Sequence, residues 1–177
     1  MGLSTAVRLQ GVCFAEASAV KGWQAIDDRV MGGVSRSQLR HDPAGHAVFE
    51  GWVSAEQGGG FASVRHAALL LGAADTTAYG LDVRGDGKRY KLNLRTAQTF
   101  DGLNYQAQWM VLAHQWVSVS LPVSAFRPMY RGREVADAPP LMPEQVQQVG
   151  LMIADQQWGP FALCIRRLYA VPGFRKE

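Results

Sequence analysis

The sequence predicts an all-β fold, a β-sandwich or jelly roll built from about ten short antiparallel strands. Apolar and polar residues alternate over short runs, and turn signals recur about every eight to twelve residues. No long segment repeats with the helical period, which argues against an α/β fold. The 19 glycines and 8 prolines are spread along the chain, as expected for many turns.

The expected strands follow from this alternation and from the turns that bound it. They cover residues 7–15, 35–40, 46–55, 61–66, 79–84, 89–96, 104–113, 116–123, 149–154 and 161–169. Residues 143–148 are the expected short helix, because Pro143 suits the first helical position. Residues 129–142 are expected to form a long connection.

Two hairpins and a core follow from the same pattern. Gly85-Asp86-Gly87 is predicted to join strands 79–84 and 89–96, and residues 104–113 and 116–123 are a second candidate pair. The side chains expected in the core are Tyr90, Leu92 and Leu94, then Val117, Val119 and Leu121, and finally Phe161, Leu163 and Ile165.

Length and composition indicate one globular domain over residues 1–177, with a formal net charge of +3. The basic residues are scattered, so a nucleic-acid partner is not expected. Cys13 and Cys164 lie in apolar runs and are expected to be buried free thiols. No transmembrane segment or secretory signal is recognised, and the expected compartment is the cytoplasm.

The run from Asp27 to Ser35 combines two carboxylates, an arginine, a glycine pair and a serine. Charged groups are rarely buried without partners, so this run is predicted to be a structured loop that leads into a strand. The expected role of its aspartates is to accept backbone N–H bonds in a turn. A loop that turns both carboxylates inward, toward an acid–base site, is the alternative.

No other residue pattern indicates catalysis. The four histidines are not accompanied by a cysteine pair, so no zinc site is expected, and Gly85-Asp86-Gly87 has no following helix to bind a dinucleotide. The sequence therefore predicts a protein that is not an enzyme and needs neither metal nor cofactor.

The strand register predicts a polar surface. If the apolar sides of strands 89–96 and 104–113 share the core, the opposite sides share one outer face. That face would carry Lys91, Asn93, Arg95, Gln106 and Gln108. Its donors and acceptors suit a sugar, polyol or peptide, and a solvated sheet face without a ligand is the alternative.

Two loops add candidates for ligand or partner binding. Asp155, Gln157 and Trp158 lie in a polar loop between two apolar strands, where an exposed aromatic ring can stack on a sugar or partner. Arg131 lies in the connection after residue 128. Each loop can instead pack: the ring against the core, and the arginine against strand-end carbonyls and carboxylates.

Several motifs occur in an order that resembles the NADH:ubiquinone oxidoreductase (complex I) intermediate-associated protein 30 family. The resemblance covers about residues 23–170. It rests on Asp28-x-Val30-Met31-Gly32-Gly33-Val34-Ser35, Gly59-Gly60-Phe61-Ala62-Ser63-Val64-Arg65, Gly85-Asp86-Gly87 with Tyr90 and Arg95, Tyr105-Gln106, Trp116, Leu121-Pro122, Phe126, Arg131-Gly132, Gly150-Leu151-Met152-Ile153-Ala154-Asp155 and Gly159-Pro160-Phe161.

The resemblance implies a galactose-binding-domain-like jelly-roll sandwich and a non-catalytic role. Mitochondrial members of the family are assembly factors for respiratory complex I, and this chain looks like a stand-alone bacterial-type member. The fold alone does not determine the ligand, because such sandwiches serve many ligands.

Three functional hypotheses follow. The first is a non-enzymatic binding module for a protein partner, acting as an assembly factor or chaperone for a respiratory or other redox complex. The second is a module that binds a carbohydrate or small polar ligand. The third is an enzyme that uses Asp27, Asp28 and Arg65, which requires these side chains to converge on one cleft.

Overall fold

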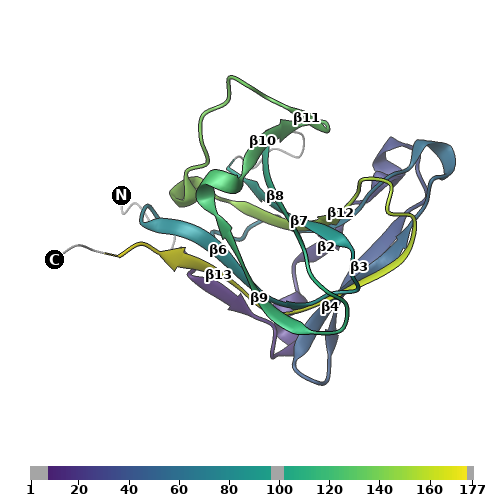
Figure 1. The fold of residues 1–177 in the computed structure, drawn as a ribbon, viewed down its shortest axis with the longest axis horizontal. Coiled ribbons are helices and arrows are strands. Elements are labelled where there is room, and N and C mark those ends of the chain that lie inside the picture. Colours follow the sequence, from purple (N-terminus) through teal and green to yellow (C-terminus); the bar gives the residue numbers. More distant parts are fainter. Residues whose placement is uncertain (1–7, 97–101, 175–177) are drawn as a thin grey trace, which may run out of the picture.

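A computed structural model describes residues 8–96 and 102–174. Two antiparallel sheets pack face to face as a β-sandwich (Figure 1). Five 3-10 helices connect the strands: η1 (Ala17–Val20), η2 (Asp28–Met31), η3 (Glu56–Gly58), η4 (Val123–Ala125) and η5 (Pro143–Gln145). No helix in the described ranges has the length and apolar character that a bilayer span requires.

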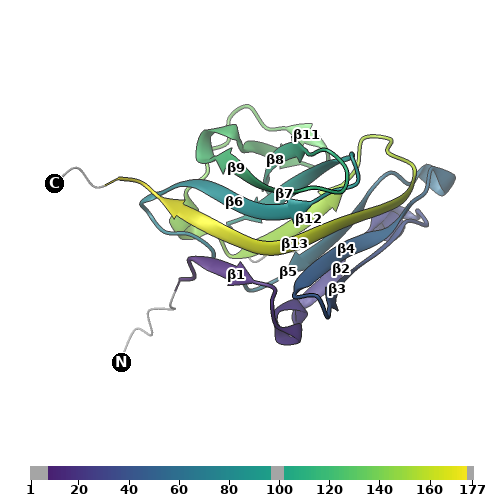
Figure 2. The same cartoon turned by 60° about the horizontal axis from the view of Figure 1, so that its bottom comes forward.

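The six-stranded sheet is organised around the long C-terminal strand β13. Its order is β3 (Arg36–Asp42), β4 (His46–Val53), β13 (Gly159–Pro172), β6 (Thr76–Arg84) and β9 (Trp116–Pro122), and β1 (Gly11–Cys13) also pairs with β13. Figure 2 shows β13 running along this sheet, with β6 and β9 on one side and β4 and β3 on the other.

The seven-stranded sheet forms the other layer. Its order is β11 (Arg133–Glu134), β10 (Arg127–Tyr130), β8 (Asn104–Met110), β7 (Arg89–Arg95), β12 (Gln148–Ile153), β5 (Ala62–His66) and β2 (Trp23–Ala25). Some strands that are adjacent in this sheet are far apart in sequence, since β12 lies between β7 and β5.

The core lies between the sheets, as the alternation predicts. Phe49 and Phe161 of the six-stranded sheet have ring centroids 4.9 Å apart, and Tyr90 of the seven-stranded sheet lies 6.2 Å from Phe49. All the predicted core side chains are buried except Val117 and Val119, which are half-buried because β9 is an edge strand. The predicted all-β sandwich is confirmed.

Both predicted hairpins are wrong. β6 pairs with β13 and β9, whereas β7 pairs with β12 and β8, so Gly85-Asp86-Gly87 carries the chain from one sheet to the other. A Cβ on Gly85 would lie 2.5 Å from the Val111 side chain, which explains the glycine. Asp86 stabilises this connection between the sheets, because its carboxylate accepts hydrogen bonds from the Ala162 N–H at 2.9 Å and from the Tyr90 hydroxyl at 3.0 Å.

The second pair fails in the same way, because β8 and β9 belong to different sheets. The local sequence indicates where the chain turns, but it does not indicate which strand each of the two flanking strands pairs with. Strands adjacent in the chain do pair at β7–β8.

Three smaller expectations are corrected. The helix expected over residues 143–148 is a single 3-10 turn, and the connection after residue 128 contains β11 and the end of β10. Both cysteines are free, but Cys13 is exposed and Cys164 is half-buried. Residue 7, the first residue of the first expected strand, lies outside the described residues.

The run that begins at Asp27 ties the two sheets together through two buried carboxylates. Asp28 is 1% exposed. On the side of β3, its Oδ1 accepts a bond from the Ser35 N–H at 2.9 Å, and its Oδ2 accepts one from the Ser35 hydroxyl. On the side of β5, its Oδ2 accepts a bond from the Gly60 N–H at 2.7 Å.

Asp27 makes a second link of the same kind. Its Oδ2 accepts a bond from the N–H of Ser37 in β3 at 3.0 Å, and its Oδ1 accepts one from the N–H of Ser63 in β5 at 2.9 Å. Asp27 therefore joins β3 of the six-stranded sheet to β5 of the seven-stranded sheet, and Asp28 joins the residues that lead into these two strands. We call Asp27, Asp28, Ser35, Ser37 and Ser63 the aspartate cluster.

Glycines make room for the Asp28 side chain. A Cβ on Gly33 would lie 2.4 Å from the Asp28 Cγ, and one on Gly59 would lie 2.6 Å from its Oδ2. Gly32 has a different role: its φ of 90° is left-handed and ends η2.

We predict that Gly33→Ala destabilises the protein by about 2 kcal/mol or more, because the new methyl group overlaps a carboxyl group that cannot move without losing its bonds. Urea unfolding at neutral pH measures the effect. Gly60→Ala is the matched control, since a Cβ there meets nothing within 4 Å. Equal loss of stability in the two variants would contradict the packing argument.

The aspartate cluster also predicts acid sensitivity. Burial acts to raise the pKa of Asp28, but hydrogen bonds from the Ser35 hydroxyl and from the N–H groups of Gly60, Ser35 and Phe61 outweigh it. The pKa of Asp28 in the folded protein therefore lies below its usual value of 3.8. A lowered folded-state pKa stabilises the protein above the unfolded pKa, and this contribution is lost as the pH falls through the folded value.

We expect Asp28→Asn to lower the free energy of unfolding by about 2 kcal/mol near neutral pH, because an amide presents donors to groups that also donate. The variant should lose less additional stability than the wild type on acidification below about pH 4. Urea titrations across this range provide the measurement. Asp75→Asn, at an exposed position, is the control, and a pH dependence altered equally by both substitutions argues against the assignment.

Candidate functional site

The predicted polar surface is present on the outer side of the seven-stranded sheet. Lys91 lies opposite Gln108, and Asn93 lies opposite Gln106, across the β7–β8 ladder. Because paired residues point to the same side, β12 and β5 extend this surface on the other flank of β7. We call it the polar face; its members are Ser63, Arg65, Lys91, Asn93, Arg95, Asn104, Gln106, Gln108, Gln148 and Met152.

The side-chain oxygens of Asn93 and Asn104 are buried at the polar face. Asn93 is 8% exposed and Asn104 is 7% exposed, and among the residues that the structure describes the Oδ1 atom of each has no hydrogen-bond partner. Asn93 Nδ2 lies 3.7 Å from the sulfur of Met152. An unsatisfied buried acceptor costs about 1–3 kcal/mol, so such oxygens commonly mark a place for water or a ligand.

Gly150 lies between Asn93 and Arg65 in the cross-strand row and contributes no side chain to the polar face. A Cβ there would meet the Asn93 Cβ at 3.7 Å and the Val64 carbonyl oxygen at 3.0 Å. The glycine therefore leaves the backbone of β12 uncovered by a side chain of its own, beside one of the unpartnered amides.

Positive charge is concentrated at the polar face. Burial, and then the charge of Arg95, lower the pKa of Arg65 to about 10, so Arg65 remains protonated at neutral pH. Arg95 donates a bond to the Gly102 carbonyl oxygen at 3.1 Å. Lys91 is neutralised by Asp155, with an Nζ–Oδ2 distance of 3.2 Å. Two arginines therefore give this part of the polar face its positive character.

The β12–β13 loop borders the polar face. Asp155 and Gln156 have φ values of 63° and 61°, an uncommon left-handed pair for residues with side chains. Gln157 fixes the loop to β7, since its side chain accepts a bond from the Arg89 N–H and donates one to the Arg89 carbonyl oxygen, both at 2.8 Å. Gln157 thus has a structural role, whereas Trp158 is 45% exposed.

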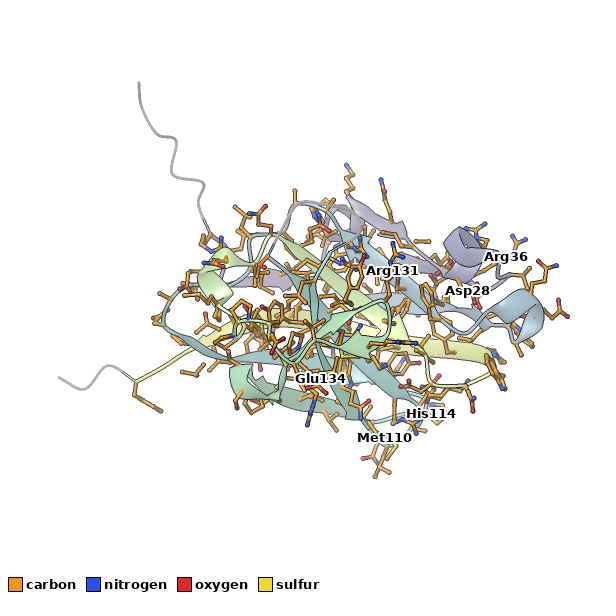
Figure 3. The ribbon with its side chains drawn as sticks, turned by 90° about the horizontal axis from the view of Figure 1, so that it is seen from above. Asp28, Arg36, Met110, His114, Arg131 and Glu134 are labelled. Carbon is orange, nitrogen blue, oxygen red and sulfur yellow. The ribbon has the colours of Figure 1, made fainter. Side chains whose placement is uncertain are left out.

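Arg131 lies at the β10–β11 turn, separate from the β12–β13 loop. It is exposed, with a φ of 48°, and its guanidinium carbon lies 5.3 Å from the centroid of the Tyr130 ring. Figure 3 shows Arg131 apart from Met110 and His114 at the β8–β9 connection.

The side chains of the third hypothesis do not form one site. Asp27 and Asp28 are engaged in the aspartate cluster, and Asp28 lies beside Arg36 at one end of the molecule (Figure 3). Arg65 belongs to the polar face, and no hydrogen bond or ion pair joins it to either aspartate in the structure as described. Within the described ranges, no three metal-ligating side chains are grouped.

Sequence reasoning found five residues of the polar face through strand parity on β7 and β8. It missed Asn104, Ser63, Gln148 and Met152. Asn104 shares the parity of Gln106 and could have been found from the same alternation. The others could not, because the position of β12 and β5 beside β7 is not encoded in local sequence.

Comparison with solved structures shows that the fold is similar to that of carbohydrate-binding modules. The chain is similar to a family 11 carbohydrate-binding module from Clostridium thermocellum in complex with a β-1,3-1,4-mixed-linked tetrasaccharide, with a TM-score of 0.64 and 12% identity over 95% of this chain and 100% of that chain. A family 29 carbohydrate-binding module has a TM-score of 0.52 and 9% identity, covering 90% of this chain and 89% of that chain. These likenesses confirm the galactose-binding-like jelly roll.

Sequence comparison identifies the family. The chain is 27% identical to an uncharacterised protein of Schizosaccharomyces pombe over 170 residues, covering 85% of this chain and 78% of that protein. The family model described as Complex I intermediate-associated protein 30 matches residues 12–165 of the 177. The chain therefore belongs to the Complex I intermediate-associated protein 30 family.

Proposed function

We propose that this protein is a non-enzymatic binding module that holds a partner protein on its polar face during the assembly of a respiratory or other redox complex. The observation that carries the proposal is the row of polar side chains on an outer sheet face, where Gln106 and Gln108 keep accessible amides beside β7. A partner can exchange hydrogen bonds with these amides, which offer both donors and an acceptor. The name of the family supports the association with a complex-assembly intermediate.

The chemistry of the polar face suits a polypeptide. The amides of Gln106 and Gln108 each offer donors and an acceptor on the same strand, at alternate positions. Arginine is enriched at protein interfaces because its planar group donates several hydrogen bonds in fixed directions. Arg65 and Arg95 are therefore residues of a type that is common at protein interfaces.

The same structure disfavours catalysis at the most polar part of the chain. Asp27 and Asp28 accept bonds from backbone N–H groups and serine hydroxyls that hold the sheets together. A general acid or base needs a proton-transfer path to a substrate, and these oxygens already have partners.

An affinity-capture experiment in cells that make complex I tests the proposal. The wild type is compared with Gln106→Ala/Gln108→Ala, which removes two amides of the polar face without touching the core. The matched control is Gln38→Ala/Gln115→Ala, which removes two exposed amides from the six-stranded sheet and the loop before β9. Quantitative mass spectrometry measures which complex I subunits are recovered.

We expect complex I subunits with the wild type and the control, and several-fold less with the face variant, because each lost hydrogen bond contributes about 1 kcal/mol. Equal recovery with all three proteins would mean that the polar face does not bind complex I subunits. The absence of complex I subunits from the wild-type sample, together with unchanged complex levels in a deletion strain, contradicts the assembly role.

A second candidate function is carbohydrate binding, which the similarity to carbohydrate-binding modules favours. Amide side chains beside an exposed ring such as Trp158 are the groups that sugars use. For this candidate we expect the β-1,3-1,4-mixed-linked tetrasaccharide, or another oligosaccharide on a glycan array, to raise the melting temperature. The shift should disappear in Gln106→Ala/Gln108→Ala. No hit on the array and no shift with any sugar exclude this candidate.

A further inference from the structure

The outer face of the six-stranded sheet carries a second group of polar side chains, unrelated to the polar face. The guanidinium carbon of Arg166 lies 3.8 Å from the centroid of the Trp116 ring, and that of Arg84 lies 5.3 Å from it. The His46 ring meets the same indole edge-on, at 5.3 Å between centroids. We call Arg84, Trp116, Arg166 and His46 the arginine–tryptophan cluster.

Four strands build this cluster. Trp116 of β9 lies opposite Arg84 of β6, which lies opposite Cys164 of β13. The β13–β6 ladder has a register shift between Ile165 and Arg167, so Arg166 is the extra residue of a β-bulge. Such bulges re-aim a side chain, and here the bulged arginine stacks on the indole.

The arginines of this sheet fall into two classes. Arg40 is paired with Glu50 at 2.5 Å, and Arg167 is paired with Asp82 at 2.7 Å. Over residues 8–96 and 102–174, neither Arg84 nor Arg166 has a carboxylate within ion-pair distance. The side-chain hydrogen bond of Arg84 goes to the Cys164 sulfur, at 3.6 Å.

The nearby carboxylates are already engaged. Asp82 accepts bonds from Arg167 and from the Ser118 hydroxyl at 2.8 Å, and Asp42 accepts one from the Ala44 N–H at 2.9 Å. The positive charge of Arg84 and Arg166 is therefore not balanced by direct contacts within the sheet. Stacking on an indole holds a guanidinium in place but leaves its N–H groups free to donate.

We propose that the arginine–tryptophan cluster is a binding site for a doubly charged oxyanion of the phosphate class, free or carried by a small phosphomonoester. Two guanidinium groups held on one ring can each donate paired bonds to the oxygens of such an anion. His46 is buried and packs edge-on against the same indole. Burial lowers the pKa of His46, Asp42 opposes this effect, and the charges of Arg84, Arg166 and Arg40 add to the lowering. The arginines therefore supply the positive charge at neutral pH.

Titration with sodium sulfate and sodium phosphate at constant ionic strength, with sodium chloride as the reference salt, tests the proposal. The Trp116 indole N–H resonance reports binding in two-dimensional NMR spectra, and thermal unfolding gives an independent readout. We expect saturable shifts with sulfate and phosphate and no shift with chloride. O-phosphoserine distinguishes the two sources: tighter binding than inorganic phosphate assigns the site to a phosphomonoester, and weaker binding assigns it to the free ion.

Arg166→Gln and Arg84→Gln should each weaken sulfate binding by about tenfold or more, because each removes charge-assisted hydrogen bonds. Arg166 is exposed, so its replacement is compatible with folding. Arg36→Gln is the matched control, since it removes one exposed positive charge from the edge strand β3. Equal effects of sulfate and chloride overturn the proposal, as does an equal loss of affinity in Arg36→Gln and Arg166→Gln.

Discussion

Two adjacent buried carboxylates hold this sandwich together at one end. Asp27 and Asp28 each accept hydrogen bonds from a segment at β3 and a segment at β5, which belong to different sheets. A buried charge is costly unless donors surround it, and here backbone N–H groups and serine hydroxyls supply them in place of a cation. This requirement explains the composition of the Asp27–Ser35 run and the close approach of Gly33 and Gly59 to Asp28.

The buried side of each strand could be predicted from local sequence, because the alternation within that strand alone determines it. The alternation of Tyr90, Leu92 and Leu94 with Lys91, Asn93 and Arg95 fixes which side of β7 is buried, and the structure agrees. Strand pairing could not be predicted in this way. Gly85-Asp86-Gly87 has the composition of a hairpin turn, yet its aspartate binds β13, a strand more than seventy residues away in sequence.

The same limit applies to the functional surfaces. Six residues of the polar face come from the adjacent strands β7 and β8 and follow from parity, whereas Ser63 and Met152 join it only because β12 and β5 pair beside β7. The arginine–tryptophan cluster draws on β4, β6, β9 and β13, and one of its members depends on a bulge. No spacing along the chain brings His46, Arg84, Trp116 and Arg166 together.

The position of the aspartate cluster bears on which side chains of the two outer faces can bind a ligand without also holding the sheets together. Because the link between the sheets lies among the connections at one end, the polar side chains of β7, β8, β6 and β9 are not needed to hold the layers together. The polar face and the arginine–tryptophan cluster lie on opposite sides of one core and share no residue. Apart from Ser63, which also belongs to the aspartate cluster, their side chains can therefore be replaced separately, so a binding defect at one face can be assigned to that face, not to a loosened sandwich.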